Sequence, residues 1–478
     1  MHEGILGIDC GTSKIAVALI EPTTRTVLDI RSADTRADIP CDPVSHKEQD
    51  VEVTINVFRR LVTETLRAHK VRLLSIGLTG QAHGILGLDQ NGNALTNYVT
   101  WQDGRGEEEI RPGVTLLQEI RERVGADRKL ASGYGIVTLY SWKKRGLPPG
   151  MNRVCGIVDY LGLQLAQERI PVTDYTMAET TGMFDMMGAC WGTEMLESLD
   201  IPTSLLPELL PPTEIAGMLK ARWLLELIGK REVPVCVTLG DNQAGYIASV
   251  REPIQSILIN IGTGSQISLA VRRAVAESLR SSLDGYDVTL RPFVDSCFLV
   301  AGSALAGGVA YRALKDFFAT AGRELFGIEE PQDLYGRMQD LAERVGSSGG
   351  MHVEPLLGGS RSNPDTRGRI EGLSFDNLKP GAFIYGVQEG ILRILKEMID
   401  PELLGERKYL VGSGNGLRRN PLLRRIAATV FERDLLIPRI VEEAAVGAAL
   451  NGAVAAGIYE NFDEARNLIR YEEQSREV

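Results

Sequence analysis

Two short segments combine an acidic or amide side chain, glycine and hydroxyl residues in the same order. The first is Asp9-Cys10-Gly11-Thr12-Ser13, and the second is Asn260-Ile261-Gly262-Thr263-Gly264-Ser265. An apolar run precedes and another follows each segment, which is typical of two strands joined by a tight glycine turn. Such a turn can press backbone N–H groups against a phosphate, because glycine permits close approach. Two copies in one chain predict a nucleotide clamped between two similar lobes.

Two aspartates, Asp9 and Asp241, each come at the end of an expected strand. Asp9 could hold Mg²⁺ through water, because Mg²⁺ prefers oxygen ligands and keeps much of its hydration shell. Asp241 could accept the proton of a hydroxyl group that attacks a γ-phosphoryl group, and Gln243 could orient the substrate. Taken alone, the segment around Asp9 or the segment around Asp241 would be explained equally well as an ordinary turn. The second copy of the loop, and the place of Asp241 between the two copies in the sequence, favour the chemical interpretation.

Two polar segments in the first half, Gln81-Ala82-His83-Gly84 and Trp101-Gln102-Asp103-Gly104-Arg105, could recognise a substrate. Their side chains offer the donors and acceptors that a polyhydroxylated molecule demands, and Trp101 can cover the C–H edge of a sugar. Taken singly, however, His83 is better explained as a core histidine. Asp103 and Arg105 are likewise better explained as a structural ion pair.

A third glycine-rich segment, Gly412-Ser413-Gly414-Asn415-Gly416, follows the apolar run at residues 409–411. A glycine loop that opens toward a helix lets a flat ring or a phosphate lie against the backbone. A plain strand-to-helix turn would explain the same residues. The segment therefore carries weight only together with the two phosphate loops.

The elements that must position these residues alternate between strands and helices, which predicts an α/β fold. We expect a first lobe over residues 1–237 and a second over residues 238–478. The first lobe is expected to contain a helix near residues 53–69 and a buried strand at residues 73–78. Helices of the second lobe are expected at residues 301–320, 385–399, 421–431 and 442–457.

The bulk composition is that of a globular protein. A chain of 478 residues is longer than one core usually serves, so two domains are expected. A net charge of -11 argues against a nucleic-acid partner, and no apolar run approaches the length of a membrane span. The six cysteines form no Cys-x-x-Cys pair, which favours reduced thiols. The first expected strand begins directly after Met1-His2-Glu3, which leaves no room for a signal peptide, so a cytoplasmic location is expected.

Taken together, Asp9 to Ser13, Gly240 to Ala244, Asn260 to Ser265 and Gly412 to Asn415 resemble, in order and spacing, the motifs of the FGGY carbohydrate kinases. The resemblance spans nearly the whole chain. It implies two ribonuclease-H-like lobes of the actin and hexokinase superfamily, with ATP and Mg²⁺ in a cleft that closes around a sugar. It also makes a homodimer plausible.

Within the family, the run from Val99 to Arg105 is most similar to the sedoheptulokinase subgroup, which implies phosphorylation of sedoheptulose to its 7-phosphate. Xylulokinases usually carry Asn where Gln102 stands. Glycerol kinases place an Arg-Glu pair at Ala82 and His83. The chain departs from the general family pattern at Leu139, where a Lys is frequent, so no role of that Lys carries over. A different pentulose or polyol kinase, an actin-like ATPase and a sugar sensor without chemistry are the alternatives.

The resemblance also assigns roles to individual residues. It implies that Asp241 is the general base and that Asp9 helps to hold Mg²⁺. The residues implied to line the phosphates of ATP are Gly11, Thr12, Ser13, Gly262 and Thr263. The residues implied to flank the adenosine are Gly412, Gly414 and Asn415. The residues implied to contact the sugar are Gln81, His83, Trp101, Asp103 and Gln243.

Overall fold

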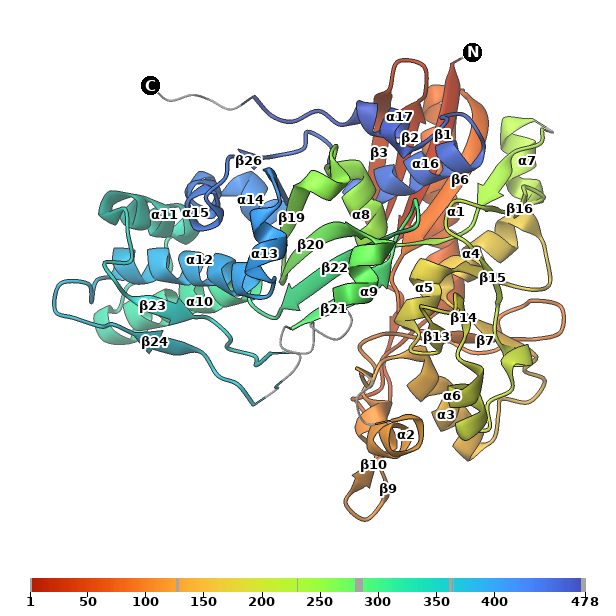
Figure 1. Cartoon of the computed structure of the whole chain (residues 1–478), viewed down its shortest axis with the longest axis horizontal. Coiled ribbons are helices and arrows are strands. Elements are labelled where there is room, and N and C mark those ends of the chain that lie inside the picture. The colour runs from red at the N-terminus through yellow and green to blue at the C-terminus, as the bar shows by residue number, and fades with distance from the viewer. Residues whose placement is uncertain are drawn as a thin grey trace. The chain divides into compact units, whose positions relative to one another are not determined.

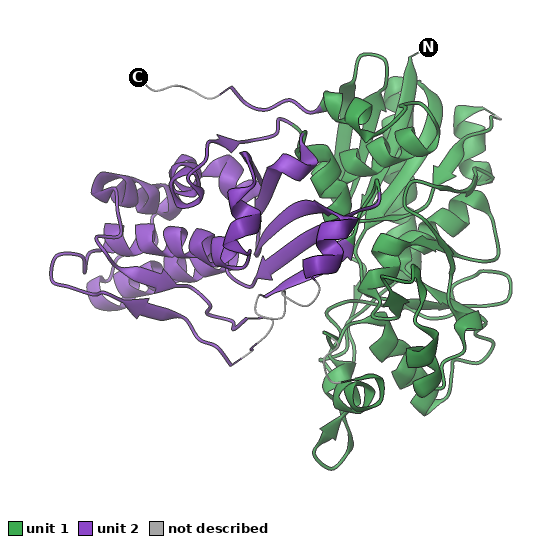
Figure 2. Ribbon diagram, viewed as in Figure 1, with its two compact units in different colours: residues 1–251, 292–295, 440–468 green, residues 252–291, 296–439, 469–478 purple. Residues whose placement is uncertain are grey.

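The structure is a computed structural model that describes residues 2–125, 129–229, 231–279, 287–360, 363 and 365–473. The chain forms two compact units, which have different colours in Figure 2. Figure 1 labels the helices and strands. The first unit comprises Met1–Arg251, Pro292–Asp295 and Ile440–Leu468, and the second comprises Glu252–Arg291, Ser296–Arg439 and Ile469–Val478. These units differ from the expected lobes, residues 1–237 and 238–478, because the segment after Gly240 and the late segment 440–468 pack with the first unit.

A seven-stranded sheet forms the centre of the first unit. Its strands are β1 (Glu3–Cys10), β2 (Lys14–Glu21), β3 (Thr26–Asp34), β6 (Arg72–Gly80), β16 (Ile215–Met218), β17 (Pro234–Cys236) and β18 (Leu239–Gly240). They run in the order β16-β17-β6-β1-β2-β3, and β18 also pairs with β6. β1 pairs antiparallel with β2 and parallel with β6, and β2 pairs antiparallel with β3. The predicted hairpin around Gly11 is therefore the start of this sheet.

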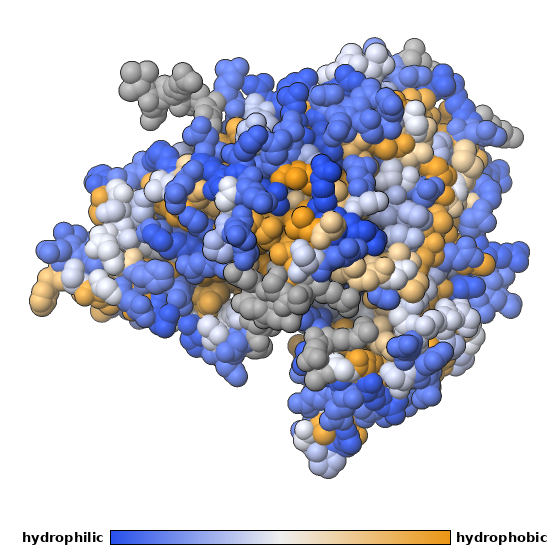
Figure 3. Space-filling model, viewed as in Figure 1, coloured by the Kyte–Doolittle hydropathy of each residue, from blue (hydrophilic) through white to orange (hydrophobic). Residues whose placement is uncertain are grey.

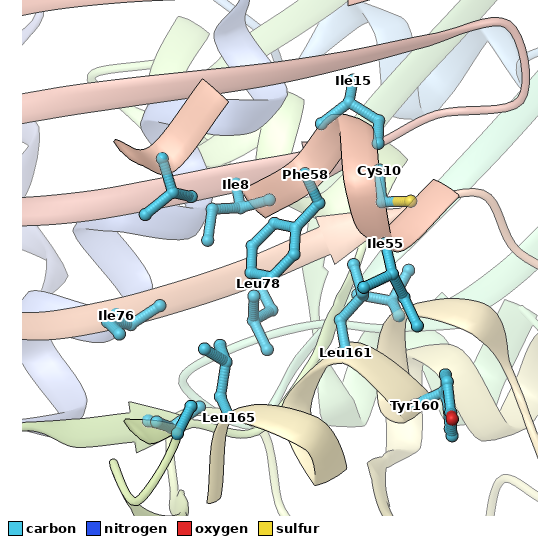
Figure 4. Close-up of a cluster of buried hydrophobic side chains, with 14 of the residues drawn as sticks. Ile8, Cys10, Ile15, Ile55, Phe58, Ile76, Leu78, Tyr160, Leu161 and Leu165 are labelled. Atoms are coloured by element: carbon cyan, nitrogen blue, oxygen red, sulfur yellow. The ribbon is translucent and has the colours of Figure 1, made fainter. Parts of the chain in front are cut away.

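One face of this sheet packs against helix α1 (Val51–His69), which confirms the helix predicted near residues 53–69. The side chain of Asp50 caps the helix by accepting a hydrogen bond from the backbone N–H of Val53. Alternate residues of β1, beginning with Leu6, join α1 in one buried cluster, because alternate side chains of a strand share a face. Figure 4 labels ten members of the cluster: Ile8, Cys10, Ile15, Ile55, Phe58, Ile76, Leu78, Tyr160, Leu161 and Leu165.

The opposite face of the same strands packs against helix α16 (Glu443–Ala455) at unusually close range. A Cβ atom at Gly7 of β1 would lie 2.0 Å from the carbonyl oxygen of Ala445, and one at Gly77 of β6 would lie 1.8 Å from that of Ala448. Only glycine allows this approach. Because most of α16 consists of small residues, the helix is buried almost throughout its length.

The second unit contains a six-stranded sheet with the order β21-β22-β20-β19-β25-β26. Its strands are β19 (Ser256–Ile261), β20 (Ser265–Arg272), β21 (Val288–Pro292), β22 (Cys297–Ala304), β25 (Tyr409–Ser413) and β26 (Leu435–Leu436). β19 pairs antiparallel with β20 and parallel with β25, and β20 pairs antiparallel with β22. This connectivity repeats that of β1, β2, β3 and β6, so the repeat predicted from two loops extends to both sheets.

One predicted helix is partly wrong. Residues 301–304 belong to strand β22, and helix α10 (Gly308–Phe326) begins only after them. These small residues form a strand because they pair with residues 265–268 of β20. The other three predicted helices are confirmed, as α12 (Pro380–Glu397), α15 (Pro421–Phe431) and α16.

Smaller elements complete both units. The further strands of the first unit are β4 (Asp38–Ile39), β5 (Glu48–Gln49), β7 (Leu86–Leu88), β8 (Tyr98–Val99), β9 (Glu109–Arg111), β10 (Val114–Thr115), β11 (Arg153–Cys155), β12 (Val172–Asp174), β13 (Phe184–Asp185), β14 (Cys190–Trp191) and β15 (Glu208–Leu210). Its further helices are α2 (Leu116–Val124), α3 (Gly135–Arg145), α4 (Ile157–Ala166), α5 (Tyr175–Thr180), α6 (Thr193–Ser198), α7 (Arg222–Ile228), α8 (Asp241–Ser249) and α17 (Phe462–Ala465). The second unit adds β23 (His352–Glu354), β24 (Arg369–Glu371), α9 (Arg273–Leu279), α11 (Leu334–Val345), α13 (Pro401–Gly405) and α14 (Asn415–Arg419).

Hydrophilic residues cover most of the face shown in Figure 3, and hydrophobic residues lie between them in smaller patches. Among the helices of the described residues, none is long and apolar enough to cross a membrane. All six cysteines are free thiols, as the sequence predicts.

Candidate active site

The first predicted phosphate loop is the turn between β1 and β2. Gly11 and Thr12 are partly buried and Ser13 is exposed. The Thr12 hydroxyl donates a hydrogen bond to Oε1 of Gln81 at 3.2 Å and accepts one from the indole Nε1 of Trp101 at 2.9 Å. The structure therefore brings the phosphate loop and two of the predicted sugar-contacting residues into direct contact.

Three carboxylates and one ammonium group interact beside this loop. The pKa of Asp9 is raised to about 7, first by burial and then by the negative charges of Asp241 and Glu442, while Lys14 opposes the shift. The Lys14 ammonium donates to both carboxylate oxygens of Glu442, at 2.6 and 2.8 Å. Neither Lys14 nor Glu442 was assigned a role from the sequence. Glu442 also has a φ of 55°, a left-handed conformation that is uncommon for residues other than glycine.

This excess of negative charge fits a divalent cation. Within the described parts of the chain, no three His, Cys, Asp or Glu side chains are arranged to hold a metal ion together. Mg²⁺ commonly binds proteins through one or two carboxylates and retains several waters. The pKa of Asp9 is raised by burial first and by the neighbouring carboxylates second, and Asp9 provides a ligand of this kind, because a nearby cation would favour its ionised form.

Asp241 is exposed and is the first residue of helix α8. One of its carboxylate oxygens accepts a hydrogen bond from the backbone N–H of Asn242 at 2.7 Å. The carboxylate is therefore accessible to a substrate and close enough to Asp9 to raise the pKa of that residue. Gln243, by contrast, is only 1% exposed, and its side-chain amide donates to the carbonyl oxygen of Pro292 at 3.0 Å.

His83 has an unusual backbone conformation. Its φ is 74°, and the N–H of Gly84 donates across it to the carbonyl oxygen of Ala82 at 2.9 Å, which is the hydrogen bond of a strained γ-turn. Strain of this kind is concentrated at functional sites. Nδ1 of His83 lies 2.7 Å from the carbonyl oxygen of Thr180 and must carry a proton, since a carbonyl can only accept. The imidazole also stacks on Tyr134, with ring centroids 4.6 Å apart.

Tyr134 is a third residue to which sequence reasoning gave no role. It lies within the run Gly133-Tyr134-Gly135, and nothing in this local pattern links it to His83. The contact depends on helix α3 beginning immediately after Tyr134, because this places the tyrosine ring opposite the γ-turn.

The structure does not present Asp103 to a ligand. Its side chain is fully buried and accepts hydrogen bonds from Nε and the backbone N–H of Arg105, at 2.6 and 2.9 Å, and from the backbone N–H of Lys47 at 2.8 Å. Arg105 also reaches Glu48 at 3.0 Å. These contacts correspond to the structural ion pair that the sequence left as an alternative. Of the predicted sugar-contacting residues, Gln81, Asp103 and Gln243 are buried, whereas His83 is partly buried and Trp101 is 43% exposed.

The second unit brings the other two predicted loops together. Gly262 and Thr263 form the turn between β19 and β20, where Thr263 is exposed. Gly414 has a φ of 85°, and a Cβ atom there would lie 2.5 Å from the carbonyl oxygen of Ile261, so the two loops touch. Asn415 is exposed at the start of α14, whereas Gly412 is buried beneath apolar side chains.

The sequence matches the models of two domains of one known family. Residues 4–248 match the N-terminal domain of the FGGY family of carbohydrate kinases, and residues 259–456 match its C-terminal domain. The chain belongs to the FGGY family of carbohydrate kinases. It is therefore an enzyme that phosphorylates a carbohydrate, and the family resemblance predicted from the motifs is confirmed.

Curated relatives of this FGGY kinase have several names. Over 98% of its length and 91% of the relative, it is 24% identical to a gluconokinase of Bacillus subtilis. Over 93% of its length and 96% of the relative, it is 26% identical to the sedoheptulokinase of Mus musculus. A glycerol kinase of Alteromonas mediterranea is 24% identical over 97% of the chain and 92% of that protein. Because these identities are so similar, they do not single out the sedoheptulokinase subgroup.

Solved structures of sugar kinases share the fold. A xylulose kinase from Rhodospirillum rubrum has a TM-score of 0.82 at 22% identity, with 98% of this FGGY kinase and 93% of that chain covered. A Plasmodium falciparum glycerol kinase solved with ADP has a TM-score of 0.78 at 18% identity, with 99% of this FGGY kinase and 93% of that chain covered. The predicted α/β fold with two lobes is thereby confirmed.

Proposed function

We propose that this FGGY kinase transfers the γ-phosphoryl group of ATP to the terminal hydroxyl of a ketose, with sedoheptulose as the first candidate and its 7-phosphate as the product. The observation that carries the proposal is the exposed carboxylate of Asp241 beside Asp9, in the same compact unit as His83 and Trp101. Sedoheptulose comes first because the run from Val99 to Arg105 resembles that subgroup.

In the proposed reaction, Asp241 accepts the proton of the sugar hydroxyl as its oxygen attacks the γ-phosphorus. A new P–O bond forms to the sugar, the bond between the γ-phosphorus and the bridging oxygen breaks, and ADP leaves. Bound Mg²⁺ would supply positive charge to the phosphate oxygens, with Asp9 as its protein ligand through water. Gly11, Thr12 and Ser13, together with Gly262 and Thr263, would line the phosphates with backbone N–H groups and hydroxyls.

The buried and exposed site residues have different proposed roles. Trp101 and His83 are the accessible side chains and would contact the sugar directly. Gln81 would act through its hydrogen bond with Thr12. Asp103 and Gln243 would contact a sugar only after exchanging the protein partners that bury them. Gly414 and Asn415 would flank the adenosine, with Gly412 supporting them from the core.

The charges of the first unit favour a neutral sugar over a sugar acid. Arg105, in the same segment as Trp101, is 4% exposed and is held by Asp103 and Glu48. Lys14 is paired with Glu442. Each of these cations already balances a carboxylate, so a substrate carboxylate would have to compete with an existing ion pair. This argument supports a ketose or a polyol over gluconate.

The test is ADP release with Mg-ATP and sedoheptulose, D-xylulose, D-ribulose, L-ribulose, glycerol, gluconate or no sugar. We expect the highest kcat/KM with sedoheptulose. The Asp241→Asn variant should still bind ATP and should lose about 10²- to 10⁴-fold in kcat, which is the usual contribution of a general base. Preference for another sugar would overturn the assignment of sedoheptulose as the substrate and leave the assignment of Asp241 as the base intact. Near-full activity of Asp241→Asn would overturn the assignment of the base.

We also propose a cytoplasmic location. All six cysteines are free, and unpaired thiols are typical of proteins in reducing compartments. Fractionation of the native cell, with an antibody against the chain, would test this location.

A further inference from the structure

The catalytic carboxylate proposed above depends on a very short strand. Asp241 directly follows β18, a strand of only two residues, Leu239 and Gly240. Gly240 is also the N-cap of helix α8, and glycine has no side chain with which to bond the first turn. The position at which α8 begins, and with it the place of Asp241, must therefore be set by contacts from other elements.

Three buried hydroxyl groups join this segment to other elements. Thr79 donates to the carbonyl oxygen of Leu239 at 2.6 Å. Thr238 donates to a carboxylate oxygen of Asp159 at 2.6 Å. Thr176 accepts a hydrogen bond from the backbone N–H of Gly240 at 2.8 Å. The bond from Gly240 to Thr176 is the one of the three that lies next to Asp241 in the chain.

The direction of the bonds at Thr176 is fixed by chemistry. A backbone N–H can only donate, so the Thr176 hydroxyl oxygen accepts from Gly240 and must send its own proton elsewhere. Its oxygen lies 2.7 and 2.8 Å from the two carboxylate oxygens of Asp174. Burial raises the pKa of Asp174 to about 7, and above that pH the ionised carboxylate can only accept. Asp174 therefore orients the hydroxyl so that a lone pair faces Gly240. Both Asp174 and Thr176 are 0% exposed, so water does not reach this pair.

We propose that Thr176, oriented by Asp174, is a positioning residue that holds the backbone entering Asp241 in the geometry required for proton transfer. This inference rests on the proposed role of Asp241 as the base. Asp174 also accepts a hydrogen bond from the backbone N–H of Met177 at 2.8 Å and so caps helix α5. The same carboxylate thus fixes both the helix that carries Thr176 and the hydroxyl that binds Gly240.

The test compares Thr176→Val, which keeps the shape but removes the hydroxyl, with Thr176→Ser, which keeps the hydroxyl. The matched control is Thr65→Val in helix α1, because Thr65 is also 0% exposed and its hydroxyl has no hydrogen-bond partner among the described residues. We expect Thr176→Val to lower kcat about 10- to 100-fold, the scale expected when a reacting group is displaced by about 1 Å. KM for ATP should be unchanged, and Thr176→Ser should restore most of kcat.

A double-mutant cycle separates positioning from a general structural effect. If Thr176 acts only through Asp241, adding Thr176→Val to Asp241→Asn should cause no further loss in the residual kcat. An equal loss in both backgrounds would overturn the proposal, as would a wild-type kcat for Thr176→Val beside an inactive Asp241→Asn. If Asp241→Asn itself keeps near-full activity, Asp241 is not the base. That outcome refutes the proposed function and is distinguishable from a result that refutes the role of Thr176 alone. Thermal melting of each variant accompanies the kinetics, and Thr176→Ala, which also lacks the hydroxyl, supplies the result if Thr176→Val does not fold.

Discussion

Replacing Asp103 by Asn should unfold the first unit more readily without changing sugar recognition. The substitution keeps the size of the side chain but removes its charge. Asp103 is fully buried and accepts hydrogen bonds from Arg105 and Lys47, while Arg105 is itself 4% exposed. The amide of Asn would turn an NH₂ donor toward at least one of these donors. The Arg105 guanidinium would be left buried with Glu48 as its one remaining carboxylate.

The size of the effect follows from this burial. Removing one partner of a buried ion pair typically costs about 3–5 kcal/mol, because the other charge remains desolvated. For a unit as large as this one, about 2 °C in Tm corresponds to 1 kcal/mol, so we expect Tm to fall by about 6–10 °C. The control is Glu226→Gln, which removes a pair in helix α7 whose partners, Arg222 and Glu226, are 89% and 64% exposed. Such exposed pairs contribute only about 0–1 kcal/mol.

Two measurements test this reasoning together. Differential scanning calorimetry gives Tm for wild type, Asp103→Asn and Glu226→Gln, and initial rates at a temperature where all three are folded give KM for the sugar. We expect a lowered Tm for Asp103→Asn and a sugar KM within about twofold of wild type, since uniform binding contacts would be intact. A wild-type Tm together with a KM raised tenfold or more would refute the ion-pair explanation and restore Asp103 as a sugar contact.

The same physical reasoning makes two further predictions. The pKa of Asp9 is raised from 3.8 to about 7 in the folded protein, so its ionisation lowers the free energy of unfolding as pH rises from about 4 to 7. Without ATP and Mg²⁺, Asp9→Asn should be more stable than wild type at pH 8 by about 1–3 kcal/mol after allowance for solvent screening, and urea titrations should show this gain shrinking toward pH 5. Gly447→Ala should destabilise the protein by about 1–3 kcal/mol or more, because its Cβ atom would lie 1.9 Å from the carbonyl oxygen of Ala244. Gly245→Ala in α8, with nothing within 4 Å of the new atom, should be neutral or stabilising by up to about 1 kcal/mol; thermal melts that ranked these two variants in the opposite order would contradict the packing argument.

The two hairpins and the strand before Asp241 could be predicted because their signals are local. Apolar runs, a glycine turn and a polar residue lie within a few positions of one another. Residues 301–304 lack such a signal, since alanine, glycine and serine suit a helix or a strand about equally in this context. Pairing with β20 decides between them, and a pairing partner distant in sequence is not visible in the local pattern. The predicted helix was wrong there for this reason.

The roles of individual site residues depend even more on distant partners. The segment from Trp101 to Arg105 contains both an exposed indole and a buried ion pair, although every residue in it except Gly104 is polar or aromatic. Asp103 is buried because the backbone N–H of Lys47, 56 positions earlier, reaches it. The strained turn at His83 is equally invisible in sequence, because its backbone N–H and Nδ1 bond to Thr180, 97 positions later. Residue type therefore predicted what the segment contains, but not which side chains remain accessible.

Helix α16 explains how two distant aspartates come to interact. Its small residues contact Gly7 of β1, the strand that carries Asp9, and Gly447 within it contacts Ala244 of α8, the helix that begins at Asp241. One helix from the end of the chain therefore fixes the strand and the helix that present both carboxylates. After burial, the charge of Asp241 is the next cause of the raised pKa of Asp9. This charge effect depends on glycine and alanine at these contacts, because any larger side chain would force β1 and α8 away from the helix. Close packing by glycine and alanine, which have no reactive groups, thus sets the positions of the two carboxylates.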